Sequence, residues 1–468
     1  MHGTYMAVVD ADRIQEYIFA PRQLKLIRGA SAIQRDVNLI GTLELLRDPV
    51  YGAGNIECNA ILDSSLDQHP AQMWEVFYAG GGNVYALFRD GAAALRFTDA
   101  ARALYRKNGA SATGAVVAWV ESFDRTLDYA QAELVARKTS CASPSQALSN
   151  PYFKTCEACG LASAACWKRN AVTGERLVCP TCESRRAASN GLSLLKEIAP
   201  HLIPPKDFDS IAEKSRPDGY LGMVYVDVDR LGRYFEEKKP LTAAKYRSES
   251  LRIRDAIKYS VFAGCRAASE ACGESSTAPF EVLLLGGDDA IVMLASQAVF
   301  PFLRRFREEF HTGIADLSFS AGVVWAHRQL PIAQYIHHAK KLLRNAKADG
   351  GARIDYLIVS ESMVRERTGN GAETHRPYSF ESFEKLVETV GAWKKTGFPS
   401  SKAHQLYAMA FEERTQATLD FLYWTSRLEL HHREQARLFF AEGFWKFEQR
   451  HATAGADLAE LWDFVEAA

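Results

Sequence analysis

Two similar stretches of the chain decide the fold: VVDADRIQEYIF at residues 8–19 and YVDVDRLGRYF at residues 225–235. Each is a short β-branched run followed by Asp-x-Asp-Arg, then Ile or Leu, then an aromatic pattern. The hydrophobic period changes from strand-like to helix-like just after the acids. Each stretch therefore predicts a strand that leads into a helix, and the chain contains this unit twice.

A second matching element follows each copy, VFYAGGGNVYALF at 76–88 and VLLLGGDDAIVML at 282–294. An apolar strand, a glycine-rich tight turn and another apolar strand predict a hairpin in both places. Strand–helix–hairpin units of this kind form an α+β sheet with a predominantly antiparallel centre, which we expect to carry helices on one face. The repeat therefore predicts a pseudo-dimer within one chain.

The remaining segments divide the chain of 468 residues into four predicted parts. The two repeat units occupy residues 1–150 and 196–372, and a cysteine-rich segment at 151–195 separates them. Residues 373–468 carry apolar side chains at helical spacing, which predicts a helical C-terminal domain.

Composition limits the kinds of partner. The formal net charge of −1 means that the chain as a whole does not attract nucleic acid electrostatically, although this charge does not exclude a local basic surface. The N-terminal sequence MHGTYMAVVDADRIQ has no charged region followed by an apolar run, so it does not predict a signal peptide. No apolar stretch reaches membrane-spanning length. We therefore expect a cytoplasmic protein without a membrane partner.

The turn of the second hairpin carries the most distinctive chemistry. Gly286 and Gly287 permit a tight turn and close backbone approach to a ligand, and Asp288 and Asp289 project from it. Asp227 ends the strand that we expect beside this hairpin. Three carboxylates from two strands suit Mg²⁺ or Mn²⁺, and two such ions can activate a ribose 3′-hydroxyl and stabilise leaving pyrophosphate. We expect all three aspartates to be catalytic, with Asp227 and Asp288 as metal ligands.

Residues after Asp227 predict contacts to a nucleotide: Val228, Arg230, Leu231 and Gly232. The last three open a helix whose backbone N–H groups can cradle phosphate oxygens. Lys347, on a later predicted helix, is the expected phosphate contact. A solvated basic helix face explains its cationic neighbours better than phosphate binding does; they are Lys340, Lys341 and Arg344.

The GGDD turn and Asp229 each have an alternative interpretation. A plain surface hairpin can also carry aspartates in its turn positions, but the repeat and the Asp-x-Asp strand end favour the metal site. Asp229 would share a strand face with Asp227 and could help to bind metal, or it could cap the following helix.

The first copy keeps Asp10 and Asp12 but lacks both turn carboxylates. Asparagine is neutral and a poorer metal ligand, so we do not expect metal chemistry in this unit. It is either a scaffold or a nucleotide-binding unit in a composite site, which would suit a reaction between two nucleotides. The expected contacts are Gly80, Gly81, Gly82 and Asn83.

Five of the nine cysteines fall between Cys156 and Cys182. Cys156-x-x-Cys159 and Cys179-x-x-Cys182, separated by 19 residues, predict one structural Zn²⁺ held by four thiolates. A redox dithiol would leave one pair unexplained. Cys166 is a spare cysteine in this scheme.

Taken together, these motifs resemble the large polymerase-cyclase subunit of type III CRISPR effector complexes, the Csm/Cmr large subunit. The matching pieces follow the family's order: IQEYIF with LKLIRGAS, AGGGN, the CxxC pair, VDVDRLGRYF, LGGDD, SAGVVWAH, LLRNAK and FPSSKAHQLY.

The resemblance implies two ferredoxin-like palm domains of the nucleotidyl cyclase type that face each other. It implies conversion of ATP to cyclic oligoadenylates, switched on by target RNA, with Asp227, Asp288 and Asp289 as the metal and catalytic residues. Lys347 corresponds to the triphosphate-binding lysine in the AK motif of related GGDEF-type cyclases. Many members begin with an HD nuclease domain, but none of the twelve histidines here is followed by Asp, so we expect no cleavage of single-stranded DNA.

The leading hypothesis is therefore a cyclase that makes a cyclic oligoadenylate or cyclic dinucleotide for antiviral defence. Its expected partners are ATP, guide or target RNA and other effector subunits, or further copies of itself. The main alternative is a non-catalytic, nucleotide-binding and RNA-sensing subunit. Template-directed polymerisation ranks last, because no thumb-like or strongly basic template channel is evident. The sequence leaves the base, the ring size and the activating signal open.

Overall fold

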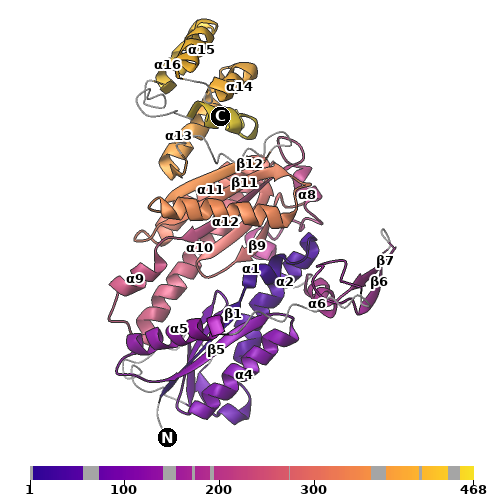
Figure 1. Cartoon of the computed structure of the whole chain (residues 1–468), viewed down its shortest axis with the longest axis vertical. Helices are drawn as coiled ribbons and strands as arrows, with labels where there is room; N and C mark the ends of the chain where they lie inside the picture. The colour runs from indigo at the N-terminus through magenta and orange to yellow at the C-terminus, as the bar shows by residue number, and fades with distance from the viewer. Residues whose placement is uncertain are drawn as a thin grey trace. The chain divides into compact units, whose positions relative to one another are not determined.

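The computed structural model describes residues 4–55, 73–140, 154–170, 174–189, 194–273, 275–359, 376–409, 414–440 and 454–467 (Figure 1). The chain divides into two compact units. Unit one comprises Met1–Glu197, Arg230–Lys258 and Leu283–Ala290, and unit two comprises Ile198–Asp229, Tyr259–Val282 and Ile291–Ala468. The tip of the second predicted hairpin thus groups with the first repeat.

Unit one contains a five-stranded sheet with the order β2-β3-β4-β1-β5. The central strand β1 pairs antiparallel with β4 and β5, and β3 and β4 form the first predicted hairpin. Asp10 lies opposite Asn83 on β4 and opposite Thr113 on β5. The strands are β1 (Tyr5–Asp12), β2 (Gly54–Asn55), β3 (Trp74–Gly80), β4 (Asn83–Phe88) and β5 (Ser111–Ala118).

Helices cover both faces of this sheet, so the expectation of helices on one face was wrong. Ala7 and Val9 of β1 pack into one core with α4 (Gly91–Lys107). Met6 and Val8 pack into another core with α5 (Phe123–Ser140) and the start of α10 (Ala243–Ala271). Alternate strand residues point to opposite faces, and β1 is apolar at consecutive positions, so both faces must be buried.

The other elements of unit one are short or peripheral to the sheet. The cysteine-rich segment forms the two-stranded sheet β6–β7 and the helix α6, which packs on α2. These elements are α1 (Ile14–Phe19), α2 (Leu24–Asp36), the π-helical turn Val37–Gly41, α3 (Thr42–Leu45), the 3₁₀ turn Pro49–Tyr51, β6 (Cys166–Asn170), β7 (Gly174–Val178), α6 (Pro180–Ala188), α7 (Leu194–Ile198) and α9 (Leu231–Glu237).

The second sheet has six strands in the order β13-β12-β11-β8-β10-β9. Strand β11 pairs antiparallel with β8, placing Ser320 opposite Asp227, and parallel with β12. The strands are β8 (Tyr220–Val228), β9 (Phe280–Leu285), β10 (Asp289–Ala295), β11 (Phe319–His327), β12 (Arg353–Val359) and β13 (Tyr378–Ser379).

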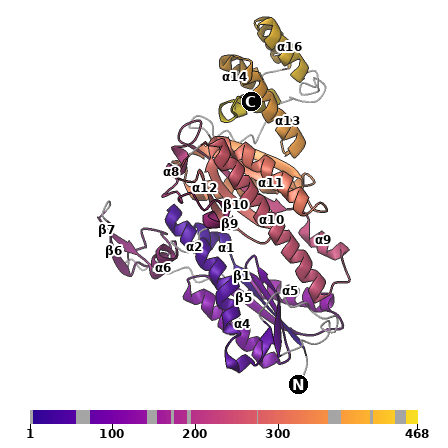
Figure 2. The ribbon, with the colours of Figure 1, turned by 180° about the vertical axis from the view of Figure 1, so that it is seen from behind.

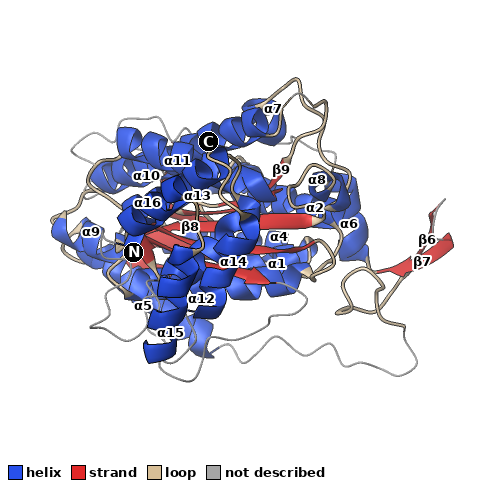
Figure 3. Ribbon diagram, turned by 90° about the horizontal axis from the view of Figure 1, so that it is seen from above, coloured by secondary structure: helices blue, strands red, loops and turns tan. Residues whose placement is uncertain are grey.

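Helices also cover both faces of the second sheet (Figure 3). A side chain at Gly222 would collide with Val299 of α11 (Val299–Gly313), and one at Gly322 would collide with α12 (Ile332–Ala348). The register makes Gly222 and Gly322 face opposite sides. On the α11 side, α10 and α11 lie next to each other, with Phe302 against Gly264 (Figure 2).

Beyond the second sheet, the described part of the chain is helical, as predicted. Its helices are α13 (Phe380–Lys395), α14 (Ser400–Met409), α15 (Arg414–Ser426), α16 (Leu430–Phe439) and α17 (Ala454–Leu461), with the 3₁₀ turn Trp462–Phe464. Unit two also holds α8 (Asp209–Ala212) and the 3₁₀ turn Ser296–Ala298. None of the helices in the described ranges has the length and apolar character that a membrane span requires.

The two sheets share one plan, which confirms the repeat. The core order β3-β4-β1-β5 in the first corresponds to β9-β10-β8-β11 in the second. The similarity extends to single residues: Arg13 and Arg230, which precede α1 and α9, both take the left-handed conformation, with φ of 50° and 52°. Non-glycine residues adopt this conformation rarely. The fold is therefore α+β with a duplicated ferredoxin-like unit.

Candidate active site

The end of β8 carries a paired carboxylate and lysine. Lys347, on α12, donates a hydrogen bond from Nζ to Oδ1 of Asp227 at 2.5 Å and another to the carbonyl oxygen of Val228 at 2.9 Å. About a quarter of the Asp227 side chain and a third of the Lys347 side chain are exposed, at 26% and 32%. The predicted phosphate contact thus lies against a predicted metal ligand in unit two.

Asp229 serves the fold. It is buried, and its carboxylate accepts hydrogen bonds from the hydroxyls of Ser318 and Ser320 at 2.9 and 2.7 Å and from the backbone of Ala352 at 2.8 Å. Arg230 occupies the cap position of α9, and no side-chain capping bond is formed there. Asp229 therefore ties β8 to β11 and to the start of β12, and it does not cap the helix.

The residues after Asp229 lie where the sequence predicted them. Arg230 precedes α9, and Leu231 and Gly232 are its first two residues. A side chain placed at Gly232 would meet no atom within 4 Å. The backbone at this position is therefore open to approach by a ligand.

Both glycines of the GGDD turn lie close to neighbouring groups. Gly286 donates its backbone N–H to the carbonyl oxygen of Asp289 at 2.8 Å, and a side chain at Gly286 would collide with the Asp289 carboxylate. A Cβ at Gly287 would lie 3.1 Å from the hydroxyl of Tyr78, and one at Gly81 would lie 3.2 Å from the Gly287 nitrogen. The absence of side chains lets the GGDD turn and the GGGN turn approach each other within unit one.

Uncharged polar groups lie near the two turn carboxylates. Gln15 Nε2 lies 3.5 Å from Oδ2 of Asp289, a long hydrogen bond. Burial, Tyr246 and the charge of Asp288 raise the pKa of Tyr78, so this hydroxyl stays protonated beside the turn. Burial also raises the pKa of Tyr246. The amide of Gln15 and the phenol of Tyr78, both from the first repeat, and the phenol of Tyr246, from α10 of the second repeat, are thus the uncharged groups near the acidic turn.

The first repeat contains a counterpart of the Asp227–Lys347 pair. Lys138, on α5, lies 2.6 Å from Oδ2 of Asp10 and 3.4 Å from Oδ1 of Asp12. Thr113 donates its hydroxyl to Asp12, as Ser320 does to Asp229. Burial raises the pKa of Asp10 although Lys138 acts in the opposite direction.

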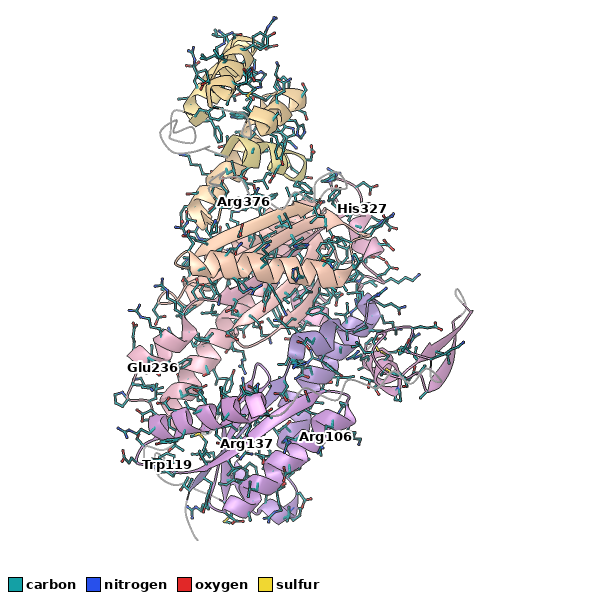
Figure 4. All side chains as sticks on the ribbon, viewed as in Figure 1. Arg106, Trp119, Arg137, Glu236, His327 and Arg376 are labelled. Carbon is teal, nitrogen blue, oxygen red and sulfur yellow. The ribbon has the colours of Figure 1, made fainter. Side chains whose placement is uncertain are left out.

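Lys138 is not among the site residues predicted from the sequence. It follows Ala130 by eight residues, as Lys347 follows Ala339, and α5 and α12 occupy equivalent places after β5 and β11. This shared spacing was the signal that could have identified it. Arg137 helps to fix α5, because its guanidinium donates to the carbonyl oxygen of Gly114 at 3.0 Å (Figure 4).

The GGGN turn brings Gly81 and Gly82 into left-handed conformations, with φ of 58° and 91°. Gly80 ends β3, and Asn83 begins β4 opposite Asp10. The position opposite the strand aspartate is thus a neutral amide in the first repeat.

The four predicted zinc ligands converge in unit one. The Sγ atoms of the four cysteines all lie within 4.8 Å of one another, and those of Cys159 and Cys179 are 4.0 Å apart. Tetrahedral Zn–S bonds of about 2.3 Å would place the sulfurs about 3.8 Å apart, so the cluster fits zinc. Cys179 Sγ also accepts from the N–H of Cys182 at 3.4 Å. The cluster is Cys156, Cys159, Cys179 and Cys182; the side chain of Cys166 lies outside what the structure describes.

The chain is similar to known palm-domain proteins. Residues 220–353 match the family model of the Cas10/Cmr2 second palm domain. A sequence search of curated proteins finds no match. Among solved structures, the chain matches a Csm1–Csm4 cassette in complex with cA4, at 15% identity and a TM-score of 0.60, over 99% of this chain and 70% of that chain.

Two other solved structures that contain Csm1 are similar to the chain to the same degree. A Csm1–Csm4 cassette in complex with AMPPNP and Csm1 from T. onnurineus each match at 15% identity and a TM-score of 0.59, over 99% of this chain and 70% of the other. Identities this low show the fold alone. The fold and the family match define a protein with two palm domains. The chain therefore resembles a Cas10-like large subunit of type III CRISPR complexes, as the sequence predicted: residues 220–353 match the second palm domain of that family, and the whole chain has the fold of Csm1.

Proposed function

We propose that the protein converts ATP into a cyclic oligoadenylate or cyclic dinucleotide messenger in type III-like CRISPR defence, by two-metal catalysis at the GGDD turn. The observation that carries this proposal is the contrast between the two turns. One keeps Asp288 and Asp289, the other has Gly82 and Asn83, and both lie together in unit one.

The repeat supports grouping Asp227 with the turn carboxylates. In the first sheet, Asp10 lies directly opposite Asn83. The equivalent positions in the second repeat are Asp227 and Asp289, because β8 and β10 are neighbours in the same sheet order. We propose Asp227, Asp288 and Asp289 as the catalytic residues, with Asp227 and Asp288 binding the ions.

Three carboxylates form a donor set that fits a hard divalent cation. Bound Mg²⁺ or Mn²⁺ would supply activation of the 3′-hydroxyl and neutralisation of the leaving pyrophosphate. The chain's own residues position the reactants. Lys347 exchanges its hydrogen bond to Asp227 for the triphosphate, and Gly286 and Gly287 allow close approach of the nucleotide. The open space at Gly232 would provide room for the nucleotide, and Arg230, Leu231 and Gly232, with Val228, would contact it, with backbone N–H groups as donors.

The first palm contributes a second nucleotide subsite in this proposal. Its glycines at 80–82 allow close approach, Asn83 provides an uncharged amide, and Lys138 supplies a cation in the place equivalent to Lys347. The two palms would hold two ATP molecules for joining, with metal chemistry confined to the GGDD side. Most of the rate enhancement would come from positioning and charge neutralisation.

Related structures suggest the partners. The Csm1–Csm4 cassettes with cA4 and AMPPNP make nucleotide binding and association with effector subunits the expected behaviour here. Guide and target RNA are proposed as further partners, and self-association is the alternative. The thiolate cluster would hold a structural Zn²⁺, which has no open coordination position for catalysis.

Labelled ATP tests the proposal directly. The protein is incubated with Mg²⁺ or Mn²⁺, alone and with candidate RNA and subunit partners. We expect a nucleotide product that disappears in the Asp288→Ala, Asp289→Ala double variant and persists in Asp99→Ala, which removes an exposed carboxylate on α4. Undiminished product in the double variant would refute the catalytic assignment. ATP binding without turnover under all conditions would support the non-catalytic, RNA-sensing alternative.

A further inference from the structure

We propose that Gln15 of the first palm is a positioning residue for the carboxylate of Asp289. The inference rests on the proposed function, because it assigns Gln15 a role at the same metal site. Gln15 Nε2 lies 3.5 Å from Oδ2 of Asp289, although the two residues are 274 positions apart in the chain. An amide from the repeat without turn carboxylates thus reaches a carboxylate of the repeat that has them.

The helix that carries Gln15 is held firmly. Arg13, in its left-handed conformation, starts α1, and its carbonyl oxygen accepts the N–H of Tyr17 at 3.0 Å. The guanidinium of Arg185 lies 4.3 Å from the centre of the Tyr17 ring and donates to the Tyr17 carbonyl oxygen at 2.8 Å. Ile14, the residue before Gln15, packs against Gly82, where an added Cβ would lie 2.4 Å from the Ile14 Cδ1 atom.

These contacts bear on how far the Gln15 amide can move. Tyr17 is fixed at its ring and its carbonyl, and its hydroxyl donates to the Asn108 carbonyl oxygen at 2.9 Å. The backbone of α1 is therefore tied to α6 and to the end of α4. Because α1 is already held in place, only the Gln15 side chain must be ordered to contact Asp289. The contact therefore costs only a small amount of side-chain conformational entropy.

The repeat gives an internal comparison. Gln15 aligns with Gly232 of the second copy, where a side chain would meet no atom within 4 Å. The second copy leaves this helix start open, whereas the first fills it with an amide that points to the acidic turn. The difference between the copies is what a composite site requires: space for a ligand on one side and a donor for the carboxylate on the other.

The chemistry of the amide suits this role. Gln15 is uncharged, so it can donate a hydrogen bond to one oxygen of Asp289 without competing with a cation for the site. Asp289 directly follows the proposed metal ligand Asp288 in the turn, so a donor that holds Asp289 also helps to fix the turn that presents Asp288. Removal of groups that orient a metal site commonly lowers metal affinity by about tenfold or more. The contact is long, so we expect an effect near the lower end of that range.

The test measures metal binding as well as turnover. Gln15→Met keeps the length of the side chain and removes the amide. We expect Mn²⁺ affinity, measured by calorimetry on the full chain with ATP present, to fall about tenfold. The Mg²⁺ concentration for half-maximal product formation should rise by a similar factor, while the rate at saturating Mg²⁺ stays within about twofold of the parent.

Glu16→Ala is the matched control. Glu16 lies next to Gln15 on α1 and forms an exposed ion pair with Arg13 at 3.6 Å, so its loss tests the stability of the helix alone. We expect no change in Mn²⁺ affinity. An equal loss in both variants, or unchanged Mn²⁺ affinity in Gln15→Met, would overturn the assignment.

The two proposals fail in different ways. A parent protein that binds Mn²⁺ about ten times more tightly than Gln15→Met but makes no product would refute the proposed function and support Gln15 as a positioning residue. A parent that makes product, with Gln15→Met identical to it in Mn²⁺ affinity and Mg²⁺ dependence, would support the function and refute the role of Gln15.

Discussion

Lys347 holds Asp227 through a hydrogen bond of 2.5 Å, and the first palm repeats this relationship with Lys138 and Asp10 at 2.6 Å. Both lysines come from the helix that follows the strand beside the aspartate. The duplicated unit therefore preserves a cation next to its strand carboxylate in both copies. The turns differ, and the proposed division of roles between the two palms rests on this difference.

Removing the Lys347 ammonium should abolish most of the proposed activity. We expect Lys347→Met to lower the rate of product formation by about 10²–10³-fold, because a charged contact to the reacting phosphates is lost. The initial rate of product formation from labelled ATP measures the effect. Lys341→Met, which removes an exposed cation from the same helix, should retain the parental rate. An active Lys347→Met variant would show that this lysine does not contact the triphosphate.

The four-cysteine cluster should contain zinc. We expect about one Zn²⁺ per chain by elemental analysis, and its loss in Cys179→Ser, because three thiolates no longer close a tetrahedral site. Thermal unfolding should show a lower melting temperature for this variant and for chelator-treated protein. Cys272→Ser, which lies outside the cluster, should keep the metal. Parental melting with no zinc bound would contradict the assignment.

A buried ion pair joins the C-terminal helix α17 to the segment before β13. Arg376 donates to Oδ1 of Asp457 at 2.7 and 2.9 Å, and Tyr378 donates its hydroxyl to Oδ2 at 2.6 Å (Figure 4). Asp457 is fully buried, and the Arg376 guanidinium also lies 3.8 Å from the centre of the Tyr356 ring. Loss of the arginine would leave a buried charge without its cation.

We therefore expect Arg376→Met to lower the free energy of unfolding by about 3–5 kcal/mol. Urea titration followed by circular dichroism measures this change. Arg344→Met removes an exposed arginine from α12 and should stay within about 0.5 kcal/mol of the parent. Equal stability of the two variants would mean that the buried pair contributes nothing to the docking of α17.

Asp355 gives a prediction about pH. Burial raises the pKa of its carboxyl above the ordinary value, although Asn345 donates to it at 3.0 Å. A carboxyl with a higher pKa in the folded chain than in the unfolded chain binds its proton more tightly when folded, so ionisation opposes folding. The penalty is absent below the unfolded pKa of about 3.9 and complete above the folded pKa.

Asp355→Asn removes this penalty, so the variant should melt at a higher temperature than the parent at pH 7. The difference should shrink as the pH falls towards about 4, where the parental carboxyl is protonated in both states. Calorimetry across this pH range gives the comparison. A pH-independent difference would show that the effect comes from packing.

The sequence predicts the repeated elements well, because their signals are local. The change of period after Asp12 and Asp229 marks a strand followed by a helix, and the glycine-rich turns mark both hairpins. The two CxxC pairs predict the cluster that the structure brings together. The consecutive apolar residues of β1 already indicated a sheet buried on both faces, a signal that the expectation of helices on one face ignored.

Contacts between distant segments are harder to predict. The partner of Gln15 is 274 residues away, and no local pattern links a helix start to a remote turn. Asp229 shows the same limit, because its hydroxyl donors come from β11 and the residue just before it. Lys138 escaped prediction because only its spacing from Ala130, and little of the surrounding sequence, repeats in the second copy.

The proposed function depends above all on cyclisation of ATP at the GGDD turn. The most direct measurement is a mass spectrum of the product made from ATP and Mg²⁺ by protein purified with its native partners. We expect a cyclic adenylate without a terminal triphosphate, and we expect no such product from the Asp288→Ala, Asp289→Ala variant prepared in the same way. The same product from that variant, or only linear or no product from the parent, would contradict it.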